Sequence, residues 1–100
     1  MAEVIWAVRA YEHLVQIGNY IEMDSPFQAK RVIQLITRQT HLLKENIRIG
    51  HKVPEMGEDI YRELRVFNYR ILYKILSEET VAIIGIVHGR RLLDPDQIEK

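Results

Sequence analysis

The chain has 100 residues, 47% of them hydrophobic, and its 14 basic residues balance its 14 acidic residues. This length provides one small domain with a single core. The zero net charge excludes a global attraction for DNA or RNA, because that attraction grows with the number of phosphates a protein neutralises. Cysteine is absent, which excludes disulfides and thiolate zinc sites. We therefore expect one domain over residues 1–100, located in the cytoplasm.

The N-terminal half predicts one strand and two helices. Residues 4–8 are β-prone, which indicates a first strand. From residue 10 the hydrophobic residues recur at helical spacing, and this predicts a helix over residues 10–23. Ser25 and Pro26 provide a capping hydroxyl and a proline suited to the first helical turn, so a second helix is predicted from there to residue 45. Because the connection is so short, the two helices must run antiparallel.

The C-terminal half predicts a loop followed by a small sheet. Residues 46–58 contain three glycines or prolines and show no periodicity, so we expect a loop there. Strands are predicted at 60–67, 69–75 and 81–87, and a short helix near 94–97. Residues 81–87 are nearly all apolar, which is typical of a central strand covered on both faces. This run is the longest apolar one, yet a membrane helix needs about 20 residues, so no membrane association is expected.

The order of these elements predicts the architecture. Tight turns between the last three strands favour an antiparallel meander, and the first strand must rejoin that sheet after the two helices. The sequence therefore predicts an α+β fold in the order β-α-α-β-β-β, with the antiparallel helix pair packed on one face of the sheet.

Several segments, taken in order along the chain, resemble one protein family. They are Asn19-Tyr20-Ile21-Glu22 before Ser25-Pro26, then Tyr61-Arg62-Glu63-Leu64-Arg65, Asn68-Tyr69-Arg70-Ile71 and finally Gly85-Ile86-Val87-His88-Gly89-Arg90-Arg91. The chain resembles the RelE/ParE superfamily, and within it the ParE-like plasmid-stabilisation toxins. The resemblance implies the growth-inhibiting toxin of a type II toxin–antitoxin system, neutralised by a cognate antitoxin, with a homodimer or a heterotetramer with the antitoxin as its assembly.

The resemblance leaves two kinds of target open. RelE-like members cut messenger RNA on the ribosome with basic residues and a C-terminal tyrosine or histidine, whereas ParE-like members poison DNA gyrase. Arg70 and Arg91 match two of the basic ribonuclease positions. The expected lysine pair is replaced around Glu63, and residues 92–100 contain no tyrosine or histidine. Because phosphoryl transfer depends on electrostatic stabilisation, the resemblance favours a non-enzymatic gyrase inhibitor. A ribosome-dependent mRNA endoribonuclease is the alternative, and a non-toxic antitoxin-binding homologue is the third reading.

Five arginines are candidates for binding the target: Arg62, Arg65, Arg70, Arg90 and Arg91. For Arg62 and Arg65 the alternative is a solvated strand face, with Glu63 pairing across to a neighbour. Arg70 is favoured because it carries the family match and directly precedes an apolar strand, which would place it on the active surface. For Arg90 and Arg91 the alternative is a solvated basic tail after the last strand.

Leu35 and Leu42 are candidates for binding the antitoxin, because they lie seven residues apart and away from the main apolar stripe of the second helix. A groove for an antitoxin helix or strand would explain them. A wide buried helix face and a homodimer seam are the alternatives that the sequence leaves open.

The remaining polar and aromatic residues suggest structural roles. His88 has no carboxylate nearby in sequence to orient it, so we interpret it as structural. The other histidines show no spacing typical of a metal site, and neither a metal nor a cofactor is expected. Tyr69 and Tyr73 alternate with isoleucines on one strand face, which predicts that they belong to the core.

Overall fold

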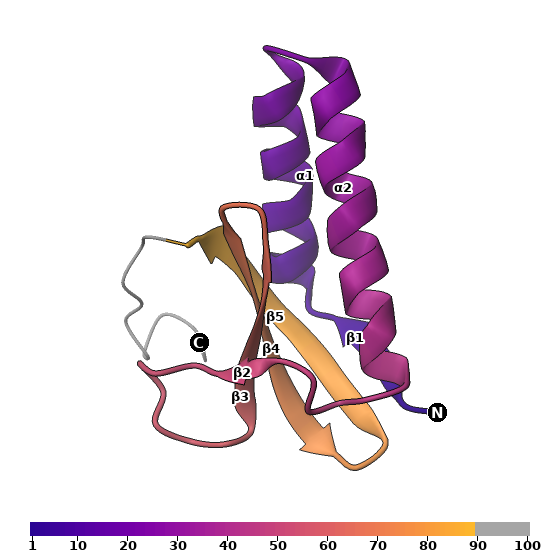
Figure 1. Ribbon diagram of the computed structural model, residues 1–100, viewed down its shortest axis with the longest axis vertical. Helices are drawn as coiled ribbons and strands as arrows, with labels where there is room; N and C mark the ends of the chain where they lie inside the picture. The colour runs from indigo at the N-terminus through magenta and orange to yellow at the C-terminus, as the bar shows by residue number, and fades with distance from the viewer. Residues whose placement is uncertain (90–100) are drawn as a thin grey trace.

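The computed structural model describes residues 1–89 (Figure 1). Its elements are β1 (Glu3–Trp6), α1 (Val8–Glu22), α2 (Pro26–His41), the 3-10 turn η1 (Leu42–Lys44), β2 (His51–Lys52), β3 (Tyr61–Val66), β4 (Tyr69–Ser77) and β5 (Thr80–His88). This order confirms the predicted α+β arrangement, with the short strand β2 added to it. The helix predicted near residues 94–97 lies outside the described residues.

The five strands form one sheet in the order β1-β5-β4-β3-β2. Strands β3, β4 and β5 form the predicted antiparallel meander. The first strand returns to the sheet as predicted, since β1 pairs parallel with β5 and places Val4 opposite Val81. The prediction that β5 is the central strand covered on both faces is wrong. It is an inner strand beside β4, and on its second face Ile84 and Val87 are only half-buried.

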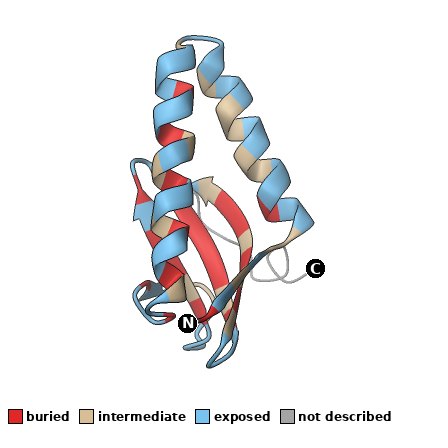
Figure 2. Ribbon diagram, turned by 90° about the vertical axis from the view of Figure 1, so that its right-hand side faces the viewer, coloured by how far each residue is buried: buried red, intermediate tan, exposed pale blue. Residues whose placement is uncertain are grey.

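The two helices form an antiparallel hairpin that packs on one face of the sheet and extends beyond its edge (Figures 1 and 2). The predicted cap of α2 is present, because Ser25 Oγ accepts a hydrogen bond from the backbone N–H of Gln28 at 3.1 Å. Helix α1 begins at Val8, two residues earlier than predicted, and no capping side chain marks this start. Burial of Ala10 against the sheet instead fixes where the helix lies.

Helix α2 ends at His41, and the rest of the predicted helix is the 3-10 turn η1. The predicted loop over residues 46–58 contains β2, which pairs with Arg62 and Glu63 of β3. A strand of two residues is too short to show the alternation by which strands are predicted. Within the described part of the chain, no helix is long and apolar enough to span a membrane.

The main core fills the space between the helices and the sheet (Figure 2). Its fully buried members include Ala10, Ile36, Leu43, Ile71, Tyr73, Val81 and Ile83. A smaller cluster contains Val53, Tyr61 and Leu72, with Met56, Ile84 and Val87 packed against it. The segment that follows β2 therefore helps to bury a second group of sheet residues.

Tyr73 belongs to the main core, as predicted, and Tyr69 packs half-buried against the same cluster. The Tyr73 hydroxyl donates to the carbonyl oxygen of Ile47 and accepts from the backbone N–H of Gly50, both at 2.9 Å. A side chain at position 50 would not fit, because its Cβ would lie 2.6 Å from the carbonyl oxygen of Glu63. These contacts fasten the segment between η1 and β2 to the sheet, and burial raises the pKa of Tyr73.

Candidate functional site

A buried cluster of charged residues is built on β3, β4 and the segment after β2. Arg70 on β4 is only 4% exposed and Glu63 on β3 only 2%. Four hydrogen bonds of 2.8 to 2.9 Å join the Arg70 guanidinium to the carboxylates of Glu55 and Glu63. Hydrogen bonds to Glu55 and then to Glu63 raise the pKa of Arg70. Both carboxylates therefore hold this arginine in its charged form inside the protein.

The expectation that Arg70 lies on an exposed, target-binding surface is wrong. The register places Arg70 opposite Arg65 and Leu72 opposite Glu63, so Glu63 reaches Arg70 diagonally across the two strands. The pairing of Glu63 with a neighbouring strand was expected, but as part of a solvated face. Glu55 completes the ion pairs from a segment 15 residues away in sequence, and this distant partner allows Arg70 to be buried.

This cluster does not present positive charge to a ligand. A phosphate group that approached Arg70 would have to displace Glu55 or Glu63, both of which repel it. Phosphoryl transfer requires cationic groups placed to stabilise the developing negative charge. Here the carboxylates of Glu55 and Glu63 lie where a phosphate would have to contact Arg70. Among residues 1–89, no group of histidines and acidic residues is arranged to hold a metal ion.

Arg62 holds loops together. Its Nε donates to the carbonyl oxygen of Asp59 at 3.0 Å, and its Nη1 donates to those of Gly50 at 3.0 Å and Arg48 at 3.4 Å. The guanidinium thus joins the segments before and after β2 to β3. Neither predicted role of Arg62, as a target contact or as a solvated residue, describes these contacts.

Arg65 differs from both other arginines, because 64% of its side chain is exposed. Its Nε lies 3.3 Å from Glu63, which is an ion pair at the surface end of the buried cluster. Of Arg62, Arg65 and Arg70, Arg65 is therefore the most exposed. Arg90 and Arg91 lie outside the described residues.

The last described residues lie beside the turn between β3 and β4. Gly89 N–H donates to the carbonyl oxygen of Asn68 at 2.6 Å. The ring of His88 meets that of Tyr69 edge-on, with 6.1 Å between their centroids. The structural role predicted for His88 agrees with this packing. The described part of the chain thus ends next to the β3–β4 turn.

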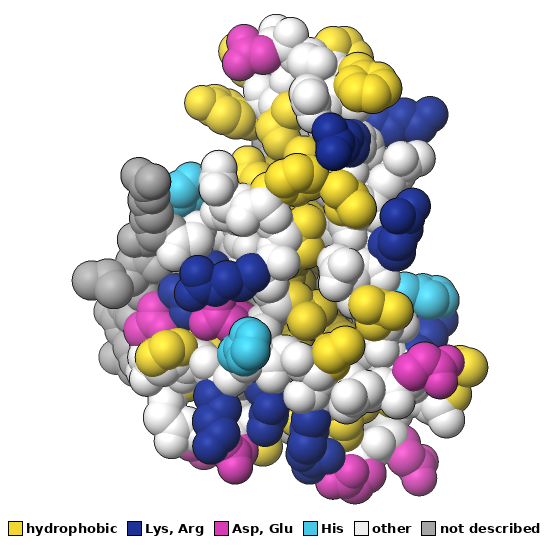
Figure 3. All heavy atoms as spheres, in the orientation of Figure 1, with side chains coloured by type: hydrophobic (Ala, Val, Ile, Leu, Met, Phe, Trp, Pro, Cys, Tyr) yellow, Lys and Arg dark blue, Asp and Glu magenta, His cyan; other side chains and the backbone are white. Residues whose placement is uncertain are grey.

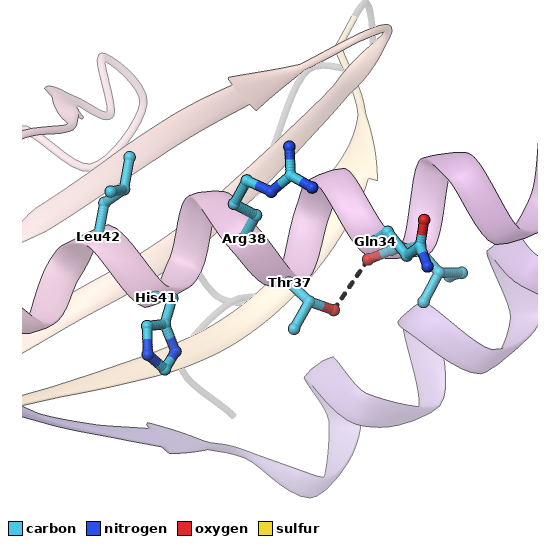
Figure 4. Close-up of a pocket in the computed structure, with 6 residues that line it drawn as sticks. Gln34, Thr37, Arg38, His41 and Leu42 are labelled. Atoms are coloured by element: carbon cyan, nitrogen blue, oxygen red, sulfur yellow. Dashed lines mark hydrogen bonds between the residues drawn. The ribbon is translucent and has the colours of Figure 1, made fainter.

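Helix α2 presents two parallel rows of side chains with a shallow groove between them (Figure 4). One row contains Ile33, Thr37 and His41, and the other contains Gln34, Arg38 and Leu42. The groove has a volume of about 520 Å³. Rows at a spacing of four residues are the ridges by which helices interlock, so such a groove fits a row of side chains from another helix.

A second hollow, between α1 and α2, continues the first because Ile33 and Gln34 line both. It has a volume of about 580 Å³, and Tyr11, Val15 and Gly18 border it on α1. We call these two hollows together the hairpin groove. Figure 3 shows exposed hydrophobic side chains gathered along the helix hairpin. The hairpin therefore offers an exposed apolar surface whose groove could accept another helix.

The two leucines predicted to bind an antitoxin lie in different surroundings. Leu42 is 42% exposed and lines the hairpin groove. Leu35 is half-buried and packs against the main core, as the alternative of a wide buried helix face describes. Tyr11 and Val15 were not predicted as site residues, although their spacing of four residues places both on the same side of α1.

Comparison with known proteins identifies the family. A family model described as the ParE toxin of the type II toxin–antitoxin system parDE matches residues 4–93. A solved structure described as the chromosomal ParDE TA system from P. aeruginosa is similar in fold, with a TM-score of 0.70 and 20% sequence identity over 88% of this chain and 96% of that chain. Comparison with curated proteins finds no match. Because the family model covers nearly the whole sequence, this chain belongs to the ParE toxin family of type II toxin–antitoxin systems.

Proposed function

We propose that this protein is the toxin of a toxin–antitoxin pair and that it inhibits DNA gyrase by binding to it, without cutting RNA. Gyrase is the target implied by the resemblance to ParE-like toxins. The observation that carries the non-enzymatic part is the position of Arg70 between Glu55 and Glu63. This arginine matches a basic position of the ribonucleases, but its guanidinium is occupied by two carboxylates.

The energetic cost of freeing Arg70 argues against the ribonuclease alternative. Breaking a buried ion pair by removing one partner costs about 3–5 kcal/mol, because the remaining charge is left uncompensated. A phosphate bound at Arg70 would have to offset that cost and also tolerate the displaced carboxylates nearby. A protein that binds its target through exposed residues meets no such barrier.

We propose the hairpin groove as the binding site for an antitoxin helix. The groove lies between rows of side chains that suit helix packing, and Leu42 and Val15 leave apolar surface exposed within it. Lys30 and Arg38 of α2 line the groove, with Glu22 of α1 at its border, and α2 contains no acidic residue. Figure 3 shows basic side chains along the α2 side of the hairpin. The complementary partner is therefore an amphipathic helix bordered by acidic residues. A ParDE system among the similar structures supports an antitoxin as that partner.

Induced expression without the antitoxin tests the target. We expect growth arrest with a DNA-damage response, and we expect the purified protein to inhibit supercoiling by purified DNA gyrase. Rapid arrest of translation with cleaved messages would instead establish the ribonuclease alternative. Normal growth at a verified expression level would favour the non-toxic homologue.

Co-expression with the neighbouring gene tests the partner. We expect its product to co-purify with this chain and to restore growth. If the two proteins are made together and do not associate, the proposed antitoxin partner is wrong, whatever the target is.

A further inference from the structure

The turn between β3 and β4 carries an exposed aromatic ring on a strained backbone. Phe67 has a φ of 54° and is 53% exposed. It is the first residue of a two-residue turn closed by the pairing of Val66 with Tyr69, a position where a positive φ favours glycine. A bulky residue there is an outlier. The core does not demand this residue, since about half of its surface is exposed, and strain of this kind gathers at functional sites.

The turn is held firmly although its ring is exposed. Asn68 accepts the hydrogen bond from Gly89 N–H at 2.6 Å, and Tyr69 packs edge-on against His88. The turn is therefore tied to the end of β5 as well as to its own two strands. A ring presented from such a support loses little conformational freedom on binding, which favours affinity.

One arginine lies over the Phe67 ring, and a second precedes the turn in sequence. The guanidinium carbon of Arg31 on α2 lies 5.8 Å from the ring centroid. Arg65 on β3 precedes the turn by two residues and has a mostly exposed side chain. Neither α2 nor residues 64–77 contain an acidic residue. The Phe67 ring thus lies beside the Arg31 guanidinium, and the second cation, Arg65, is mostly exposed while its Nε pairs with Glu63 at 3.3 Å.

This combination fits a protein surface better than a nucleic acid. Aromatic residues, phenylalanine among them, and arginine are enriched at protein interfaces relative to the rest of the surface. Binding a nucleic-acid strand instead relies on a positively charged groove that follows the backbone, and the net charge of this chain is zero. The complementary surface is an apolar socket bordered by carboxylates.

We propose that the Phe67 turn, with Arg31 and Arg65 beside it, is the element that inserts into an acidic-rimmed apolar socket on the protein target of this toxin. The inference rests on the proposed toxin function and names the surface that performs it. The antitoxin uses the hairpin groove, so the two partners depend on different residues.

The substitution Phe67→Gly separates binding from folding. Glycine suits the positive φ, so we expect a melting temperature equal to that of the wild type or higher by up to about 4–8 °C. Loss of the ring should raise the concentration needed to inhibit purified DNA gyrase by about 30-fold, as loss of an aromatic hot spot does. Growth arrest on induction should disappear, while affinity for the antitoxin should stay unchanged.

Two control variants isolate the ring and its position. Phe67→Trp keeps a large aromatic side chain and should retain toxicity. Phe27→Ala removes another ring, 74% exposed, from the start of α2, and it should leave toxicity and gyrase inhibition unchanged.

The outcomes distinguish this inference from the proposed function. If Phe67→Gly folds and remains as toxic as the wild type at equal expression, the inference is wrong. It is also wrong if the variant loses antitoxin binding but stays toxic, because the turn would then belong to the antitoxin surface. If the wild type leaves gyrase unaffected and Phe67→Gly still abolishes growth arrest, gyrase is the wrong target and the Phe67 surface stands.

Discussion

Glu63 and Arg70 form an ion pair in which both side chains are almost completely buried, with hydrogen bonds of 2.8 and 2.9 Å between them. The pair joins neighbouring strands, and Glu55 extends it to the segment that follows β2. Removal of two charges from water is costly, so a buried pair contributes stability only through its mutual attraction and complete hydrogen bonding. The cluster is therefore sensitive to the loss of one member.

We expect Arg70→Met to destabilise the fold by about 3–5 kcal/mol, because it removes the buried counter-charge of Glu63 and leaves that carboxylate with its longer ion pair to Arg65 at the surface. The double variant Arg70→Met with Glu63→Leu removes both charges and should be more stable than Arg70→Met alone. Urea unfolding of the wild type, both single variants and the double variant measures this coupling. Additive effects of the two substitutions would contradict it.

Tyr73→Phe should cost about 1–3 kcal/mol, because the backbone groups of Ile47 and Gly50 lose their buried partner. The substitution should also change the response to alkaline pH. Burial raises the pKa of Tyr73, so the folded state keeps the phenolic proton at a pH where the unfolded state, with a pKa of about 10, has lost it. The wild type should therefore lose stability as pH rises above about 10.

Urea unfolding from about pH 8 to about pH 11 tests this dependence. We expect a smaller loss of stability with pH in Tyr73→Phe than in the wild type. Equal losses in the two proteins would show that Tyr73 does not contribute to the alkaline transition.

The fold was largely predictable because its signals are local. The start of α2 is signalled by the neighbouring residues Ser25 and Pro26, and β4 forms where it was predicted, although its burial does not alternate because residues 70–73 are all buried. The order of strands in the sheet was less accessible. The apolar composition of β5 indicated burial, but whether a strand is central depends on which segments pair beside it.

The charged residues show why the site was harder to predict than the fold. Arginine on a strand is usually exposed, and sequence alone did not reveal that Glu55 would fold over the sheet to meet Arg70. Arg62 likewise found its acceptors in backbone carbonyl groups of two loops. Such partners come from tertiary contacts with loop segments, which show no hydrophobic periodicity from which their position could be predicted. Contacts between residues far apart in sequence therefore determine which arginine side chain stays exposed.

Val15→Glu should weaken antitoxin binding at least about tenfold, since Val15 borders the hairpin groove and the new carboxylate would meet the acidic border proposed for the antitoxin helix. Stability should change by less than about 0.5 kcal/mol, as for other surface substitutions. Val8→Glu is the matched control, because Val8 is an exposed residue of α1 that does not line the groove. Calorimetric titration with purified antitoxin measures the difference, and equal affinities for both variants would contradict the groove assignment.

Arg62 and Arg65 lie three residues apart, and their replacement by alanine should have opposite consequences. Arg62→Ala removes donors from three backbone carbonyl oxygens, so we expect a loss of about 1–3 kcal/mol in stability.

Arg65→Ala breaks a surface ion pair worth about 0–1 kcal/mol, and Glu63 keeps Arg70 as its partner. Its melting temperature should stay near that of the wild type, while gyrase inhibition weakens and loses part of its salt dependence. Thermal melts and supercoiling assays at two salt concentrations distinguish the two arginines. If Arg62→Ala instead melts like the wild type and loses toxicity, the target surface extends to Arg62.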